Sequence, residues 1–413
     1  MPNRTSRQLA AVAATALLGA SSIAVGSSQP AEAAPPGSVR FATFNASLNR
    51  ATQGGLVADL STPDNAQART IAEIVQRNRP DVVLLQEFDH DAAGRGVDLF
   101  AENYLGRSQD GADPIEYPYS FSAPVNTGVP SGLDLNGDGT VGGPDDAWGF
   151  GVFPGQYGMV VYSRHPIAVE DVRTFQLFRW ADMPGALLPD DPSTPEPADF
   201  FDAEELEQVR LSSKSHWDVP IRIGQRQVHL LASHPTPPVF DGPEDRNGRR
   251  NSDEIRFWSD YVSGPSASRY VYDDEGVRGG LRPGSMFVVA GDQNSDPEDG
   301  DSLPGSISQL LDNPKVGSGQ VPTSEGAVEA TELQGGPNLL HTAPPAQDTA
   351  DFAEPPGNIR VDYVLPSRQL RTVDAGVFWP TSDDPLSRLT GTFPFPSSDH
   401  RLVWVDVRVP GAR

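Results

Sequence analysis

The stretch "DVVLLQEF" (residues 81–88) decides the fold. Four apolar residues, from Val82 to Leu85, follow one another without a polar residue between them, and Pro80 stops the helical pattern before them. A short apolar run of this kind is typical of a strand that is buried on both faces. The run ends at Gln86 and Glu87, so we expect a carboxylate at the mouth of an inner strand.

The segments around this strand predict sheets with a few covering helices. "VRFATFNA" (39–46) predicts a strand that ends near Asn45, and the segment from about 64 to 78 has one apolar helical face. Asn251 and Glu254 have the spacing of a capping box, which predicts the start of another helix. Further strands are expected at 116–121, 156–163, 169–178, 217–223, 226–234, 285–292, 359–367 and 401–409. Many strands with few helices indicate an α+β protein built on packed sheets.

Side chains that can bind a cation or move a proton recur near the ends of these strands. They are Asn45, Glu87, His234, Asp292 with Asn294, Asp362, and Asp399 with His400. Each of them alone has an ordinary explanation as a turn former, a solvated strand end or a core histidine. Their recurrence around one sheet edge indicates a functional site.

The order of the motifs resembles that of the endonuclease/exonuclease/phosphatase superfamily, whose type is deoxyribonuclease I. The motifs are "FATFN", "PDVVLLQE", "GMVVYSRHPI", "ASH", "GDQN", "RVDYVLPS" and "SSDHRLVWVDV", and they span about residues 39–409. The resemblance implies a four-layered α/β sandwich, in which two packed, mainly antiparallel β-sheets are flanked by helices. It also implies hydrolysis of phosphoesters with a divalent metal, Mg²⁺ or Mn²⁺.

The resemblance assigns a role to each of these residues. Glu87 would be the principal metal ligand, supported by Asn45 and Asp399, because Mg²⁺ prefers hard oxygen ligands. His400, held by Asp362, would act as the general base or as a donor to the phosphoryl group. The remaining three would position the nucleophile and contact phosphate oxygens or the leaving group: Asp292, Asn294 and His234.

Four further residues are predicted to contact the substrate, each with an alternative. Tyr119 is either a substrate contact or a core residue, and Arg164 either binds phosphate or forms a surface ion pair. Arg249 and Arg250 belong to the basic segment "DRNGRRNSDEIR" (245–256). Its arginines either contact substrate phosphate or form the salt-bridged face of a helix.

The segment "DLNGDGTVGGPD" (134–145) has the oxygen spacing of a calcium-binding loop. The ligand positions would be Asp134, Asn136, Asp138, Thr140 and Asp145. Glycines permit the tight turn that such a loop requires. No convincing helix precedes the segment, so the alternative is a solvated acidic turn. A structural Ca²⁺ is the prediction.

The N-terminus has the features of a secretory signal. Arg4 and Arg7 precede an apolar run at 9–25, and "AEA" at 31–33 has the form of a cleavage site. We therefore expect a signal peptide at 1–33, a secreted protein, and one domain at 34–413 with insertions at about 122–155, 181–204, 264–284 and 295–358. The chain contains no cysteine, so neither disulfides nor thiolate metal sites support it.

The charge of the chain bears on the class of substrate. A formal net charge of −25 repels polyanions and opposes broad binding to nucleic acid. We therefore expect a phosphatase or phosphodiesterase for small organic phosphates, with no stable nucleic-acid partner, no integral membrane association and a monomeric state. The alternatives are an extracellular nuclease, a hydrolase of phospholipid headgroups, or an inert binding module.

Overall fold

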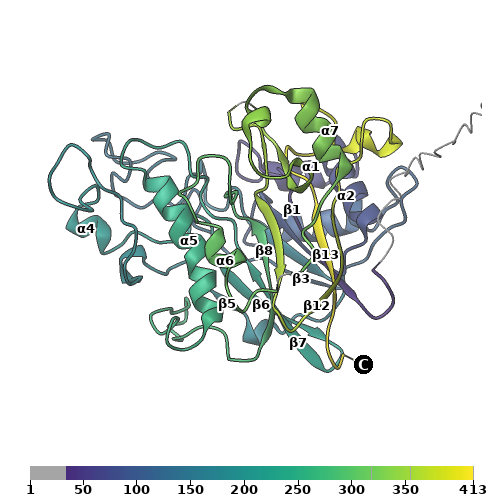
Figure 1. Ribbon diagram of the computed structural model, residues 1–413, viewed down its shortest axis with the longest axis horizontal. Coiled ribbons are helices and arrows are strands. Elements are labelled where there is room, and N and C mark those ends of the chain that lie inside the picture. The colour runs from purple at the N-terminus through teal and green to yellow at the C-terminus, as the bar shows by residue number, and fades with distance from the viewer. Residues whose placement is uncertain (1–33, 318, 354, 413) are drawn as a thin grey trace, which may run out of the picture.

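The computed structural model describes residues 34–317, 319–353 and 355–412, and two β-sheets form its centre (Figure 1). The predicted signal peptide lies outside the described residues. The first sheet has the order β12-β13-β1-β2-β4-β3 and the second the order β11-β8-β7-β6-β5. In each sheet one pair is parallel, β1 with β2 and β7 with β8, and the other pairs are antiparallel. Both sheets are therefore mixed, with mainly antiparallel pairing.

Most strands lie within the predicted segments. The first sheet contains β12 (Arg371–Val377), β13 (Val403–Arg408), β1 (Val39–Asn45), β2 (Val82–Gln86), β4 (Met159–Ser163) and β3 (Tyr119–Phe121). The second sheet contains β11 (Asp362–Pro366), β8 (Met286–Asp292), β7 (Arg226–Ala232), β6 (Trp217–Ile223) and β5 (Arg173–Thr174). A separate ribbon pairs β9 (Ala350–Asp351) with β10 (Asn358–Ile359).

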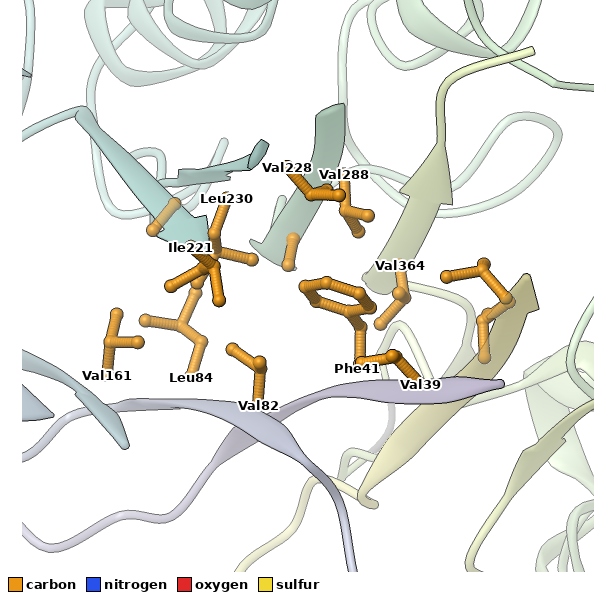
Figure 2. Packing of buried hydrophobic residues seen from close by; sticks show 14 of the residues in the cluster. Val39, Phe41, Val82, Leu84, Val161, Ile221, Val228, Leu230, Val288 and Val364 are labelled. Atoms are coloured by element: carbon orange, nitrogen blue, oxygen red, sulfur yellow. The ribbon is translucent and has the colours of Figure 1, made fainter. Parts of the chain in front are cut away.

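Apolar side chains of the two sheets meet in one buried layer. Figure 2 shows Phe41 and Leu84 of the first sheet pointing toward Leu230 and Val288 of the second. Successive residues of a strand point to opposite faces, so Val83 packs instead on the helical side of its sheet. This double coverage is the physical reason why the run at 82–85 contains no polar residue.

The helices cover the outer faces of the sheets. Helices α1 (Gly55–Leu60), α2 (Ala66–Asn78) and α3 (Arg95–Phe100) pack on the first sheet, and α5 (Arg246–Ser263) packs on the second (Figure 1). Short helices α4 (Ala203–Leu206), α6 (Ser308–Leu311) and α7 (Glu325–Gln334) lie in the connecting segments. The arrangement is helix, sheet, sheet, helix, so the predicted four-layered α/β sandwich is confirmed.

Two local predictions were wrong, and one strand was not predicted. Helix α5 begins at Arg246, so Asn251 and Glu254 do not cap its start. Both residues lie in the middle of the helix, and their buried side chains bond to backbone outside it: the Asn251 amide donates to the Thr236 carbonyl, and Glu254 accepts from the Ser213 N–H. The segment 169–178 forms only a 3₁₀ turn and the two-residue β5, and strand β12 was not predicted.

No described helix combines the length and the apolar character needed to span a bilayer. The longest described helix, α5, has 18 residues, but charged side chains are spread along it.

Candidate active site

Strand ends bring the predicted site residues to one edge of the two sheets. Asn45 at the end of β1 lies opposite Gln86 of the parallel strand β2, which places Asn45 beside Glu87. In the second sheet Asp292 at the end of β8 pairs with Asp362 at the start of β11. The site is therefore assembled from both sheets.

The amide of Asn45 links carboxylates that belong to the two sheets. Its Nδ2 donates to Glu87 Oε1 at 3.2 Å and to Asp292 Oδ2 at 3.1 Å. Its Oδ1 accepts from the backbone N–H of Ser47 at 3.2 Å. The other Glu87 oxygen accepts from the side-chain amide of Asn49 at 2.8 Å. Both amides fix the direction of the Glu87 carboxylate.

His400 lies between two aspartates. Its Nδ1 is 2.9 Å from Asp362 Oδ2, and its Nε2 is 3.6 Å from Asp292 Oδ2. The hydroxyl of Thr349 donates to the same Asp362 oxygen at 2.9 Å, and the ring of Phe352 packs edge-on against the imidazole. Asp362 therefore orients the imidazole, and Nε2 is directed toward Asp292.

The charges in this cluster shift one another's pKa values. Burial alone would raise the pKa of Asp292, but the imidazoles of His400 and His234 lower it below its usual range. Burial raises the pKa of Asp362 to about 6 despite the neighbouring His400. Burial opposes charge on His400, yet the carboxylates of Asp362 and Asp292 outweigh it and raise its pKa well above the usual value. The cluster thus favours a protonated His400 beside an ionised Asp292.

His234 contacts the opposite side of Asp292. Its Nε2 is 3.3 Å from Asp292 Oδ2, and burial together with the charge of Lys214 lowers its pKa. Gly291 allows this approach, because a Cβ atom at that position would lie 1.9 Å from the carbonyl oxygen of Ser233. A side chain at 291 would therefore push His234 away from Asp292.

Asp399 and Asn294 complete the predicted set. Asp399 lines the site, and its carboxylate accepts a long hydrogen bond of 3.4 Å from the hydroxyl of Ser398. Asn294 follows β8, where its backbone N–H donates to Asp292 Oδ1 at 2.9 Å and its side-chain amide donates to the carbonyl of Pro235. Asn294 thus holds both Asp292 and the loop after His234.

Two of these residues have left-handed backbone conformations. Glu87 has φ 55° and Asn294 has φ 50°. A left-handed conformation costs a residue with a side chain roughly 1–3 kcal/mol, and such residues cluster at functional sites. The surrounding hydrogen bonds hold both residues in place, which supports a role for this edge beyond stability.

The site opens into a cavity of about 960 Å³. Glu87, His234, Asp292, Asp399 and His400 line one part of it. Apolar and aromatic side chains line another part, and acidic side chains lie at the exposed rim. A cavity of this size suits an organic molecule rather than a phosphate ion alone.

The structure does not bring Tyr119 or Arg164 to this cavity. Tyr119 pairs with Ser163, which pairs with Val82 at the far end of β2. At about 3.3 Å per residue, Val82 lies roughly 16 Å from Glu87 along the strand. Arg164 bonds to Asp81 at 3.1 Å, so the surface ion pair is the correct alternative for it.

The arginines of α5 also differ from the substrate-binding prediction. The guanidinium of Arg249 donates to the carbonyl of Leu188 and does not line the cavity. Arg250 lines the cavity, but its guanidinium donates to the carbonyls of Leu211 and Trp148 at 2.7 and 2.6 Å. Both side chains therefore stabilise the connecting segments that surround the helix.

The predicted calcium loop forms a series of turns closed by its own side chains. The carboxylate of Asp134 accepts the backbone N–H groups of Asp138 and Gly139, and that of Asp138 accepts the N–H of Thr140. Asn136 accepts the same Asp138 N–H, and Asp145 is exposed at the cavity rim. Buried Asp146, which was not predicted, bonds to the N–H groups of the loop instead. Calcium binding at this loop stays a prediction.

Sequence reasoning missed Lys214, which also lines the cavity. Its side chain is buried, and burial lowers its pKa. Within the described part of the chain no hydrogen bond or close ion pair reaches its ammonium group, although the carboxylates of Glu254 and Glu87 favour its charged form. The chain has only two lysines, Lys214 and Lys315, and this rarity was the signal that could have drawn attention to it.

The residues of the site fit a divalent cation. Among the described side chains, Asp292, Asp362 and His400 form the one group of three acidic or histidine residues whose ligand atoms lie within 4.8 Å of one another. The Oδ1 atom of Asp362 is buried and accepts no hydrogen bond in the described structure. Glu87 and Asp399 add carboxylates from the first sheet. Hard oxygen donors of this kind are the ligands that Mg²⁺ and Mn²⁺ prefer.

Comparison with family models agrees with this geometry. The model described as the endonuclease/exonuclease/phosphatase family matches residues 42–400. The chain belongs to that family. It is therefore a phosphoester hydrolase by family, and the sequence resemblance and the fold class are confirmed. A search of curated proteins found no match.

A search of solved structures found proteins that are similar to this chain at low sequence identity. An endonuclease/exonuclease/phosphatase from Beutenbergia cavernae DSM 12333 is 19% identical, with 91% of this chain and 72% of that chain covered and a TM-score of 0.48. Sphingomyelinase C from Streptomyces griseocarneus is 16% identical, with 89% and 99% covered and a TM-score of 0.40. An AP endonuclease from Archaeoglobus fulgidus is 11% identical, with 90% and 100% covered and a TM-score of 0.42.

Asp348 should make the free energy of unfolding of this protein depend on pH. Burial and the neighbouring Asp296 raise the pKa of Asp348 to about 8. A carboxyl with a raised pKa holds its proton more tightly in the folded state, so the free energy of unfolding falls as the pH rises from about 4 to 8. We expect Asp348→Asn to be more stable than the wild type at pH 8, by at least about 1 kcal/mol, and nearly equal at pH 4.

Chemical denaturation at several pH values measures this difference. The control is Asp171→Asn, since Asp171 is exposed and should show no such pH trend. If Asp348→Asn follows the pH dependence of the wild type, ionisation of Asp348 does not contribute to it.

Proposed function

We propose that the protein is an exported, divalent-metal-dependent hydrolase that acts on small organic phosphates as a phosphatase or phosphodiesterase. The observation that carries the proposal is the position of the reactive cluster. Glu87, His234, Asp292 and His400 line a cavity whose other walls are largely apolar, and Asp145, Asp299 and Asp301 lie at the same cavity. A concave site with acidic residues in its lining favours a compact substrate.

The placement of the basic residues argues against a polyanionic substrate. Arg249 and Arg250 donate to backbone carbonyls, and Arg164 pairs with Asp81. A nuclease needs cations along the phosphate backbone of its substrate, and the chain carries a formal net charge of −25. The nuclease therefore ranks below a hydrolase of small esters.

The cluster supplies acid, base and positioning groups for phosphoester hydrolysis. Asp292 is ionised and takes the proton of the attacking water as the water oxygen bonds to phosphorus. His400, oriented by Asp362, carries a proton at Nε2 and gives it to the leaving oxygen as the bond between that oxygen and phosphorus breaks. Burial and the charge of Lys214 lower the pKa of His234, whose Nε2 lies 3.3 Å from Asp292 Oδ2 and positions that carboxylate. Glu87, Asn45 and Asp399 would hold the divalent ion, which offsets the negative charge of the phosphoryl oxygens when it is bound.

Lys214 binds the substrate phosphate in this scheme. Its side chain is buried and makes no described hydrogen bond, and burial lowers its pKa although the carboxylates of Glu254 and Glu87 favour the charged form, so ionisation is costly until an anion arrives. We expect Lys214→Met to lower kcat/KM about 10- to 100-fold, the size of one hydrogen bond to a charged group. The same change should raise the melting temperature, because the cost of burying the ammonium group outweighs its attraction to the neighbouring carboxylates.

The matched control for this variant is Lys315→Met. Lys315 is exposed and remote from the cavity lining, so its removal should change neither kcat/KM nor the melting temperature. A Lys214→Met protein with wild-type kcat/KM would remove Lys214 from the substrate site.

The function is tested by product release from a panel of esters. The purified protein without residues 1–33 is assayed with Mg²⁺, Mn²⁺ or EDTA on small phosphomonoesters, small phosphodiesters, plasmid DNA, RNA and phospholipid vesicles. Metal-dependent release from the small esters alone supports the proposal. Cleavage of DNA or RNA makes the protein a nuclease, and release of headgroups from vesicles makes it a phospholipid hydrolase.

Export is supported by the signal-like segment at 1–33. Its test is the N-terminal sequence of the protein recovered from the culture medium of cells that express the full chain. A mature protein that begins near Ala34 is the expected result, and retention of the intact chain inside the cells contradicts export.

A further inference from the structure

One end of the cavity is an apolar chamber that the catalytic cluster does not explain. We define the apolar chamber by five lining residues: Leu135, Trp148, Trp180, Phe201 and Val209. All five are buried and belong to one hydrophobic cluster. Hydrolysis of a phosphoester bond needs none of them, so the chamber invites a separate explanation.

Polar contacts hold the walls of the chamber in place. The indole N–H of Trp180 donates to Asp253 Oδ2 at 2.7 Å, and the carbonyl of Trp148 accepts from Arg250 at 2.6 Å. The guanidinium of Arg210 lies over the ring of Trp148 at 5.0 Å. A pocket with walls fixed in this way is largely formed before a ligand binds, which lowers the cost of binding.

The chamber and the catalytic cluster share one cavity. Lys214 and His234 line the cavity together with Trp148 and Val209, so no wall separates the reacting group from the apolar surface. The cavity measures about 960 Å³. Pockets of about 300–1,000 Å³ hold drug-sized molecules, so a phosphate or a methyl ester would leave most of this volume unfilled.

We propose that the apolar chamber is a subsite for an aliphatic or aromatic group of the substrate. The substrate is then a phosphoester with a phosphate at Lys214 and His400 and with an uncharged organic group of several carbon atoms in the chamber. This inference rests on the proposed function and narrows it. The inference makes phosphorylated sugars poor substrates, because the hydroxyl groups of a sugar would lose their hydrogen bonds in such a chamber.

Binding of alkylphosphonates tests the subsite without turnover. Isothermal titration calorimetry of the protein in Mg²⁺ compares methyl-, butyl-, hexyl- and octylphosphonate, which have one organic group each. Burial of each methylene should lower Kd about threefold to fourfold until the chamber is full. The heat-capacity change of binding should become more negative with chain length, as expected for apolar burial.

Variants of the chamber locate the effect. Val209→Trp should fill the chamber, so that butyl-, hexyl- and octylphosphonate bind no better than methylphosphonate. Phe201→Ala should enlarge it and extend the gain to longer chains. The control is Val169→Trp, the same substitution at an exposed position that does not line the cavity. In this variant Kd should depend on chain length as it does in the wild type.

The results separate this inference from the proposed function. If methylphosphonate binds and small esters are hydrolysed but Kd does not change with chain length, the chamber is not a subsite and the function stands. An unchanged series in both Val209→Trp and Phe201→Ala also overturns the subsite. If no phosphoester is hydrolysed with any metal, the proposed function fails whatever the binding series shows.

A second arm distinguishes the source of the apolar group. A membrane lipid and a soluble ester can carry the same apolar group. The hydrolysis rate of a monomeric short-chain phosphodiester is therefore compared with that of its long-chain analogue in neutral vesicles. The buried position of the chamber predicts faster hydrolysis of the monomer. Faster hydrolysis in vesicles would place the apolar group in the membrane rather than in the chamber, and would overturn the proposal.

Discussion

His400→Ala lowers kcat by about 10²- to 10⁴-fold, the usual contribution of a general acid or base. The expectation follows from the position of the imidazole, whose Nδ1 is 2.9 Å from Asp362 and whose Nε2 faces Asp292 at 3.6 Å. Loss of the ring removes the proton donor and leaves two buried carboxylates without their shared cation. Steady-state kinetics on the best small ester from the panel measures the effect.

A second histidine–aspartate pair provides the matched control. His229 Nδ1 is 2.7 Å from Asp218 Oδ1, and neither residue lines the cavity. We expect His229→Ala to keep kcat within about twofold, because transition-state stabilisation comes only from groups that act at the reacting centre. Circular dichroism shows whether the His400→Ala protein is folded. A folded variant with the wild-type kcat would exclude His400 from the chemistry.

Glu87→Gln is the second change with a large expected effect. The carboxylate accepts hydrogen bonds from Asn45 and Asn49, and glutamine keeps its size but loses its charge. We expect kcat/KM in Mg²⁺ to fall by at least about 10²-fold, comparable with the loss of one electrostatic contact to the transition state. Treatment of the wild type with EDTA should abolish activity to a similar extent.

Thermal melting gives a readout of the metal that does not depend on activity. A ligand that binds only the folded state stabilises it by about 2.7 kcal/mol at a concentration of 100 times Kd. Mg²⁺ or Mn²⁺ should therefore raise the melting temperature of the wild type but not that of Glu87→Gln. The control is Glu170→Gln at an exposed ion pair with Arg222, which should respond as the wild type does. An equal metal response in Glu87→Gln would contradict a role for Glu87 in holding the ion.

Much of the fold followed from local pattern. The run at 82–85 predicted an inner strand because both of its faces are covered, one by the second sheet and one by helices. The start of α5 could not be found in this way. Asn251 and Glu254 have capping-box spacing, yet distant backbone groups bind them: the carbonyl of Gln293 and the N–H of Ser213. A local motif cannot reveal that its side chains have partners about 40 residues away.

For the basic residues near the substrate site, too, the sequence pattern and the three-dimensional contacts gave different answers. The sequence suggested phosphate binding for Arg250, but the carbonyls of Trp148 and Leu211 accept its hydrogen bonds. Lys214 gave no motif, and only the packing of segments around β6 brings it beside His234. Basic side chains that bind carbonyls and basic side chains that face a cavity look alike in a sequence.

The sequence by itself determined the family, the layered sandwich and the set of reactive side chains at strand ends. It could do so because strand periodicity is local and because each reactive residue lies at a strand end or within four residues of one. Only the tertiary structure decided how those residues are connected, as in the bridge of Asn45 between Glu87 and Asp292. It also revealed the apolar chamber, because the walls come from segments far apart in the chain, and their approach depends on packing that no local pattern encodes.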